Sequence, residues 1–148
     1  MNRFENRVCR FVPCASFGYA PQAVNTIDAG GVVPFNTVIQ NLSTCDCKRF
    51  IDLNTGTGNI FIKERGKYNV TVRLDVPAVA DTWIILETGN GEDPTATIYN
   101  VAGDMSWDVK IKEDSVIKVV VGGTGPIVFT PAATTTPNMA LITITKIS

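Results

Sequence analysis

The side chains of this chain that could carry chemistry are two pairs of adjacent carboxylates and two close pairs of cysteines. The carboxylates are Glu92/Asp93 and Glu113/Asp114, and the chain has no histidine. Its absence removes the commonest general base and the commonest metal ligand. Adjacent residues of a strand face opposite sides, and both carboxylate pairs stand in turn-like sequence. We therefore interpret them as solvated turns rather than as an acid/base pair, and we predict a non-enzyme without a cofactor.

The cysteines are Cys9, Cys14, Cys45 and Cys47, and three states remain open for them. Reduced, structural thiols fit a chain without a secretory signal. Four cysteines in two pairs also form a weak candidate zinc site, because structural zinc takes four protein ligands; however, Cys45-Asp46-Cys47 is tighter than the usual spacing. A disulfide within or between subunits is the third state, although a bridge between Cys45 and Cys47 would be strained.

Composition places the chain among lightly charged globular proteins. The hydrophobic content is 45%, the charged content 18% and the formal net charge −1. No basic patch is visible, so duplex nucleic acid is not expected as a partner. No apolar run approaches the roughly 20 residues of a membrane span, and residues 1–20 lack the apolar block of a secretory signal. We expect a protein used inside a cell, released by lysis or a non-classical route, or assembled into a virus particle.

The clearest structural signal is an alternation of apolar and polar residues over 68–76. A period of two is typical of a half-buried β-strand. One face of this strand is predicted to carry Tyr68, Val70, Val72, Leu74 and Val76, and the other Asn69, Thr71, Arg73 and Asp75.

Similar patterns recur along the rest of the chain, and no segment shows a helical period. Turn sequences rich in Gly, Pro, Asn and Thr separate them. A spacing of roughly 8–12 residues between strands predicts an all-β sandwich or barrel. The strands are expected at 32–42, 50–53, 59–63, 68–76, 83–86, 96–101, 105–111, 116–121 and 140–147.

Residues 1–28 have a different character from residues 29–148. This N-terminal segment is rich in Arg, Phe and Cys, contains Pro13 and Pro21, and lacks clean periodicity. A frayed terminus is one interpretation. We favour an arm that docks on another protein, because the segment holds a large amount of apolar surface. Its candidate anchoring residues are Phe4, Val8, Phe11, Phe17 and Tyr19.

Four stretches, in their order along the chain, resemble the tumour necrosis factor-like jelly roll that complement globular heads share. They are residues 31–35 (GVVPF), residues 60–70 with the Gly66-Lys67-Tyr68-Asn69-Val70 motif, residues 112–119 and residues 138–147. The likeness covers about residues 30–148 and is nearest to the bacterial and phage branch of that family. The usual Gly-Asp turn is replaced by Glu113-Asp114, and no collagen-like stalk is present.

The resemblance implies an antiparallel jelly-roll sandwich and a homotrimer packed around an axis. In such a trimer, aromatic and aliphatic side chains from each subunit become buried. The alternative for each side chain is a place in the core of its own subunit. The candidates for the trimer interface are Phe35, Phe61, Trp83 and Trp107.

A jelly roll with a short anchor and no stalk looks like a phage structural protein, made in the host cytoplasm and assembled into the virion. Its arm would contact capsid or other virion proteins in a head fibre, a decoration protein or a fibre tip. A bacterial spore-coat or cell-surface module is the alternative, and an enzyme acting on glycan is a third. Distal loops on a rigid scaffold could touch a host-surface glycan, with Asn90, Glu92, Asp93, Thr134 and Thr135 as candidates.

Overall fold

The computed structural model describes residues 14–41, 44–45, 48–76, 79–89, 95–98, 103–131 and 140–147, with backbone alone at 44–45, 48–49, 95–98 and 103. All the named secondary-structure elements among these residues are β-strands. The described residues include no helix that is long and apolar enough to cross a membrane. Many predicted site residues lie outside the described residues or side chains. They are Phe4, Val8, Cys9, Phe11, Cys45, Cys47, Asn90, Glu92, Asp93, Thr134 and Thr135.

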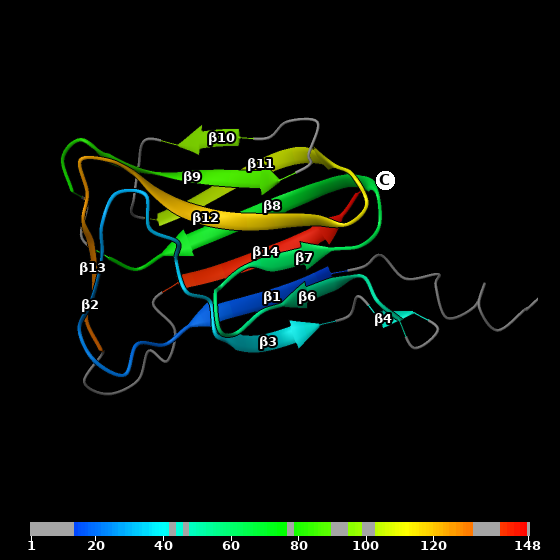
Figure 1. Cartoon of the computed structure of the whole chain (residues 1–148), viewed down its shortest axis with the longest axis horizontal. Helices are drawn as coiled ribbons and strands as arrows, with labels where there is room; N and C mark the ends of the chain where they lie inside the picture. Colours follow the sequence, from blue (N-terminus) through cyan, green and yellow to red (C-terminus); the bar gives the residue numbers. More distant parts are fainter. Residues whose placement is uncertain are drawn as a thin grey trace, which may run out of the picture.

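Two five-stranded sheets form the body of the molecule, and all their pairings are antiparallel (Figure 1). The first sheet has the order β11-β8-β14-β1-β3 and the second β10-β9-β12-β7-β6. The first sheet is made of β11 (Gly103–Ile111), β8 (Gly66–Leu74), β14 (Ala140–Lys146), β1 (Cys14–Tyr19) and β3 (Thr37–Asn41). The second is made of β10 (Thr95–Ile98), β9 (Thr82–Gly89), β12 (Ser115–Gly123), β7 (Ile60–Ile62) and β6 (Ile51–Leu53).

Two short antiparallel strand pairs lie outside the two large sheets. Strand β2 (Asn25–Ile27) pairs with β13 (Ile127–Phe129) at one end of the sandwich, and β4 (Thr44–Cys45) pairs with β5 (Lys48–Arg49). Several neighbouring strands, such as β1 and β14 or β7 and β12, come from distant parts of the sequence, which is typical of a jelly roll. The predicted all-β antiparallel jelly roll is therefore confirmed.

The hydrophobic core lies between the two sheets and follows the predicted alternation. In β8, Tyr68, Val70 and Val72 are fully buried, whereas Asn69 and Thr71 are half-exposed on the other side of the strand. Strands β9 and β14 alternate in the same way, and β12 does so over residues 115–119 before a stretch that is buried on both sides. Removing apolar surface from water contributes about 25 cal/mol of stability per Å². This burial between the sheets is the main interaction that holds them together.

The structure corrects the prediction for part of the N-terminal arm. Phe17 and Tyr19 lie in β1, between β14 and β3, and are 0% and 7% exposed. The Tyr19 ring meets Phe129 edge-on, with ring centroids 5.2 Å apart. These two residues belong to the core of the sandwich, so their prediction as anchoring residues is wrong. Residues 14–28 contain β1 and β2 and are part of the jelly roll.

Candidate functional site

The aromatic residues predicted for a trimer interface do not come together on one surface. Phe35 is fully buried in the core, so its prediction as an interface residue is wrong. Trp107 lies on β11, on the strand side that faces the core, and packs against it. Its indole Nε1 is buried and has no hydrogen-bond partner in the structure. The alternative, a place in the subunit's own core, holds for Phe35, and Trp107 is partly buried against the same core.

Phe61 and Trp83 instead lie on the outward side of the second sheet, at opposite ends of β12. Both are half-buried; Phe61 is opposite Val116 in the pairing and Trp83 opposite Gly122. A Cβ added at Gly122 would overlap Trp83 Nε1 and Cδ1, so the indole lies over a strand position that must lack a side chain. Phe61 and Trp83 therefore do not form one aromatic patch.

A continuous polar surface does exist on the outward side of the first sheet. The strand pairings place its residues in three rows that cross β11, β8, β14 and β1. We call these positions the polar grid. Its rows are Asp108–Asn69–Thr145–Cys14, Ser106–Thr71–Thr143–Ser16 and Asp104–Arg73–Leu141–Gly18.

Asn69 is the centre of the hydrogen bonding on one half of the polar grid. Its Nδ2 donates to Ser106 Oγ at 3.0 Å and to Asp108 Oδ1 at 2.9 Å. Its Oδ1 accepts a bond from Thr71 Oγ1 at 3.1 Å. One side chain on β8 therefore fixes a carboxylate and two hydroxyls on β8 and β11.

The other half of the polar grid, on β14 and β1, has its own hydrogen bonds. Ser16 Oγ and Thr143 Oγ1 share a bond at 3.0 Å, and Thr145 Oγ1 donates to Cys14 Sγ at 3.5 Å. These side chains are half-buried although they face away from the core. Most polar side chains of the grid thus find a partner within the grid itself.

Charge is confined to the β8 and β11 half of this surface. Arg73 Nε lies 3.8 Å from Asp104 Oδ1, and both side chains are largely exposed. The next row outward pairs Lys67 with Lys110. The β14 and β1 half carries no charged residue in any of the three rows.

The polar grid has no arrangement suited to catalysis. Cys14 is a free thiol, and its recorded side-chain partner is the Thr145 hydroxyl rather than a base. Among the described residues no three His, Cys, Asp or Glu side chains are grouped to hold a metal ion. The candidate zinc site stays a prediction, because the other three cysteine side chains lie outside the described set.

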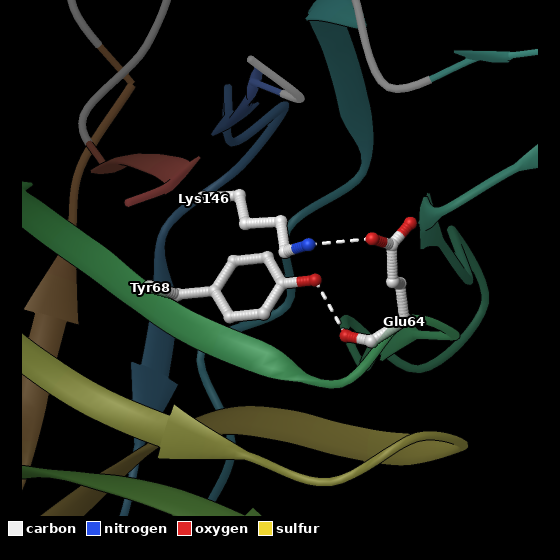
Figure 2. Close-up of polar contacts among 3 residues, drawn as sticks. All are labelled: Glu64, Tyr68 and Lys146. Carbon is white, nitrogen blue, oxygen red and sulfur yellow. Dashed lines mark hydrogen bonds and ion pairs between the residues drawn. The ribbon is translucent and has the colours of Figure 1, made fainter. Parts of the chain in front are cut away.

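A separate polar cluster, made of Glu64, Tyr68 and Lys146, connects residues at one end of the first sheet (Figure 2). The buried Tyr68 hydroxyl donates to the Glu64 backbone oxygen at 2.6 Å, and Lys146 Nζ contacts Glu64 Oε1 at 2.5 Å. Burial, followed by the nearby Glu64 carboxylate, raises the pKa of Tyr68 well above its ordinary value. The phenol therefore stays protonated and keeps donating. We interpret this cluster as structural, because it joins the end of β14 to the segment that leads into β8.

The period of two places Asn69, Thr71 and Arg73 on the polar side of their strand but identifies no site there. The alternation Leu141-Ile142-Thr143-Ile144-Thr145 was the other available signal. The rows themselves depend on strand register, which the sequence does not display.

Comparisons with known proteins agree with this geometry at the level of the fold. No protein-family model and no curated protein matches the chain. Eiger TNF from S. frugiperda is a similar solved structure, with a TM-score of 0.67, 13% identity and 94% of each chain covered. Murine APRIL at pH 8.5 has a TM-score of 0.62 and 10% identity, over 93% of this chain and 100% of that one. Rabbit GITRL has a TM-score of 0.53 and 12% identity, over 92% of this chain and 94% of that one.

These likenesses define the class of the fold, which is a tumour necrosis factor-like jelly roll. The predicted jelly-roll fold is confirmed. At 10–13% identity they show the fold alone. A place in the bacterial and phage branch stays a prediction.

Proposed function

We propose that this chain is a non-enzymatic structural protein that forms a homotrimer and is assembled into a virus particle as a head fibre, decoration protein or fibre tip. The observation that carries the proposal is the jelly roll itself, which accounts for 94% of the chain in the alignment to Eiger TNF. The described part of the chain adds no catalytic arrangement to it. A rigid β-sandwich that presents a polar face and loops is a scaffold for contacts.

Self-association is the first part of this proposal, and it is supported by the fold. The resemblance noted in the sequence implies three copies around an axis. Light scattering of the purified chain over a range of concentrations measures this directly. We expect the mass of three chains at high concentration. A mass of one chain at every concentration contradicts the trimer.

The virion role is the second part, supported by the sequence resemblance to the phage branch. The test follows the chain, by mass spectrometry, through a density gradient of a lysate from the organism that carries it. We expect the chain to band with nucleic-acid-containing particles. Banding with the cell envelope or spore coat would support the surface-module alternative. Recovery only as free protein would contradict both.

Adhesion to a host-surface glycan would deepen the same role. Its candidate residues in the distal loops lie outside the described residues, so it stays a prediction from the sequence. The proposal for assembly into a particle does not depend on it.

A further inference from the structure

Positive charge is gathered at one end of the sandwich, where two turns lie side by side (Figure 1). Residues 63–65 join β7 to β8, and residues 112–114 join β11 to β12. Because β8 pairs with β11 and β7 with β12 up to these turns, the strand register brings them together from distant parts of the sequence. This basic end carries six of the eight Lys and Arg side chains that the structure describes, together with three carboxylates. Its members are Lys63, Arg65, Lys67, Lys110, Lys112 and Lys146, with Glu64, Glu113 and Asp114.

The basic end contains unfavourable charge contacts that a partner of opposite sign would relieve. Lys67 lies directly opposite Lys110 in the pairing of β8 with β11, and like charges at opposite positions destabilise a sheet. Both lysines are exposed, as are Lys63 and Lys112. None of these four forms an ion pair with another described side chain. Four ammonium groups are therefore available at this end for carboxylates of another molecule.

The opposite end of the sandwich is acidic. It lies where β8 and β12 end and where β9 and β11 begin (Figure 1). Strand β8 runs from one end to the other over nine residues, a length of about 30 Å. The described charged side chains of this acidic end are Asp28, Asp75, Asp81, Asp104 and Arg73. Four carboxylates and one cation give it a net charge of −3, against +3 from the six cations and three carboxylates of the basic end.

Equal and opposite charges on the two ends favour a second copy as the partner of the basic end. A dense polyanion such as duplex nucleic acid would meet Glu113 and Asp114 as well as the lysines, and it would leave the acidic end without a role. The acidic end of a second copy also presents Arg73 among its carboxylates, so it can match both signs. Complementary potentials of this kind bring two surfaces together and fix their orientation.

From these observations we infer that the basic end of one copy docks on the acidic end of the next, so that copies stack head to tail. Such a contact uses a different patch on each partner and repeats from copy to copy. A single pair of exposed charges contributes little, but three copies held side by side would make the contact three times at once. The inference goes beyond the proposed function, because stacking joins the ends of the molecules and does not require a trimer.

The first experiment is sedimentation velocity of the full-length chain at two salt concentrations. We expect species of several trimers at about 10 mM salt, where charges act over about 30 Å, and their loss at about 150 mM, where this distance is about 8 Å. The association constant for stacking should fall at least about tenfold between the two conditions. A sedimentation coefficient that is the same at both salt concentrations would overturn the inference.

Two charge-reversal variants identify the ends that meet. Lys63→Glu/Lys112→Glu makes the basic end negative, and Asp28→Lys/Asp75→Lys makes the acidic end positive. Each variant alone should fail to stack at low salt, because ends of like charge then face each other. A mixture of the two should stack again, since the intact acidic end of the first variant fits the intact basic end of the second. Recovery in the mixture also shows that both variants are folded.

Lys112→Gln and Lys118→Gln are the matched pair that separates position from net charge. Each removes one positive charge, but Lys118 lies in the middle of β12, opposite Glu87. We expect Lys112→Gln to weaken stacking at least about threefold more than Lys118→Gln, which is the size of effect that one exposed charge pair gives. Equal effects would show that stacking follows net charge alone and would overturn the role of the basic end.

The outcomes separate stacking from the proposed function. A trimer that does not grow at low salt overturns stacking and retains the trimer, whereas a monomer that grows at low salt retains stacking and contradicts the trimer. Stacking by either reversed variant alone would overturn the pairing of these two ends. A short DNA duplex is the last probe. Binding of the duplex that is tighter than stacking, and that Lys63→Glu/Lys112→Glu abolishes, would overturn the second copy as the partner.

Discussion

Tyr68 connects the core of the protein to its surface within a single side chain. Its ring is fully buried between the sheets, and its hydroxyl reaches the Glu64 backbone oxygen at 2.6 Å. Glu64 in turn contacts Lys146 near the end of β14 (Figure 2). A buried phenol needs a partner for its hydroxyl, and the chain supplies this partner from the turn that precedes β8.

Replacing Tyr68 by Phe is expected to lower the free energy of unfolding by about 1 kcal/mol, the usual net value of one hydrogen bond. The effect also depends on pH. Because the pKa of Tyr68 is raised in the folded state above the ordinary 10.0, the unfolded chain releases this proton first as the pH rises. The stability that this raised pKa contributes is fully present below pH 10. It is lost progressively as the pH rises from there toward the pKa of Tyr68 in the folded state. Urea unfolding at several pH values measures both effects.

The matched control is Tyr19→Phe, which removes a hydroxyl that accepts a bond from Asn25 Nδ2 at 2.7 Å. Wild type and Tyr19→Phe should both lose stability above pH 10 more steeply than Tyr68→Phe. A slope in Tyr68→Phe equal to that of wild type would show that the phenol makes no special contribution.

At the scale of the strands, the sequence predicts those features that depend only on the local alternation of apolar and polar residues. The alternation over 68–76 is clear because large apolar and polar residues take turns, and β8 follows it residue by residue. Strand β1 was missed because Ala15, Ser16 and Gly18 are small and give only weak alternation. Its identity as a strand comes from β14 and β3 on either side, and no local signal contains that information.

The candidate site was less predictable than the strands. The outward direction of Asn69 and Thr71 follows from the period of two, but their grouping with Ser106 and Thr143 requires the register of three strands. Residue type pointed to the aromatic side chains for the interface. However, a large apolar side chain in a small domain usually fills the core, and Phe35 does so.

The turn between β6 and β7 contains a glycine that the fold requires. Gly58 has φ of 80°, and a Cβ there would lie 2.6 Å from the Val33 carbonyl oxygen and 2.8 Å from Pro34 Cα. Both contacts are with backbone, which cannot move away cheaply. Gly58→Ala is expected to lower the free energy of unfolding by at least about 2 kcal/mol, through the left-handed backbone and the overlap together.

Gly56 in the same turn provides the control for this prediction. A Cβ at Gly56 would meet only Asn54 Oδ1, at 3.3 Å, a side-chain atom that can shift. Chemical denaturation should therefore place Gly56→Ala within about 0.5 kcal/mol of wild type, as for most surface substitutions. Similar losses in both variants would contradict the steric explanation.

At the scale of the whole molecule, the first and last strands of the described chain lie side by side. Strands β1 and β14 pair from Cys14 with Thr145 to Tyr19 with Ala140 (Figure 1). The first sheet is therefore continuous only when both ends of the jelly roll are present. Removing β1 would leave β14 and β3 without a common neighbour.

Two truncations locate the boundary between the arm and the jelly roll. A chain of residues 14–148 keeps both large sheets and should unfold cooperatively in denaturant, with well-dispersed amide signals by NMR. A chain of residues 29–148 loses β1 and β2 and should not fold. The loss of Phe17 from the core alone corresponds to about 3–5 kcal/mol, against a total stability of about 5–15 kcal/mol for a typical domain.

The chain of residues 14–148 also decides what residues 1–13 contribute to assembly. If the jelly roll contains the surface for self-association, residues 14–148 should associate with the same constant as the full chain, measured side by side by light scattering. The N-terminal residues would then be available for a different partner, as an anchoring arm requires. A shorter chain that folds but stays monomeric would assign the association to residues 1–13. A folded chain of residues 29–148 would contradict the place of β1 in the sheet.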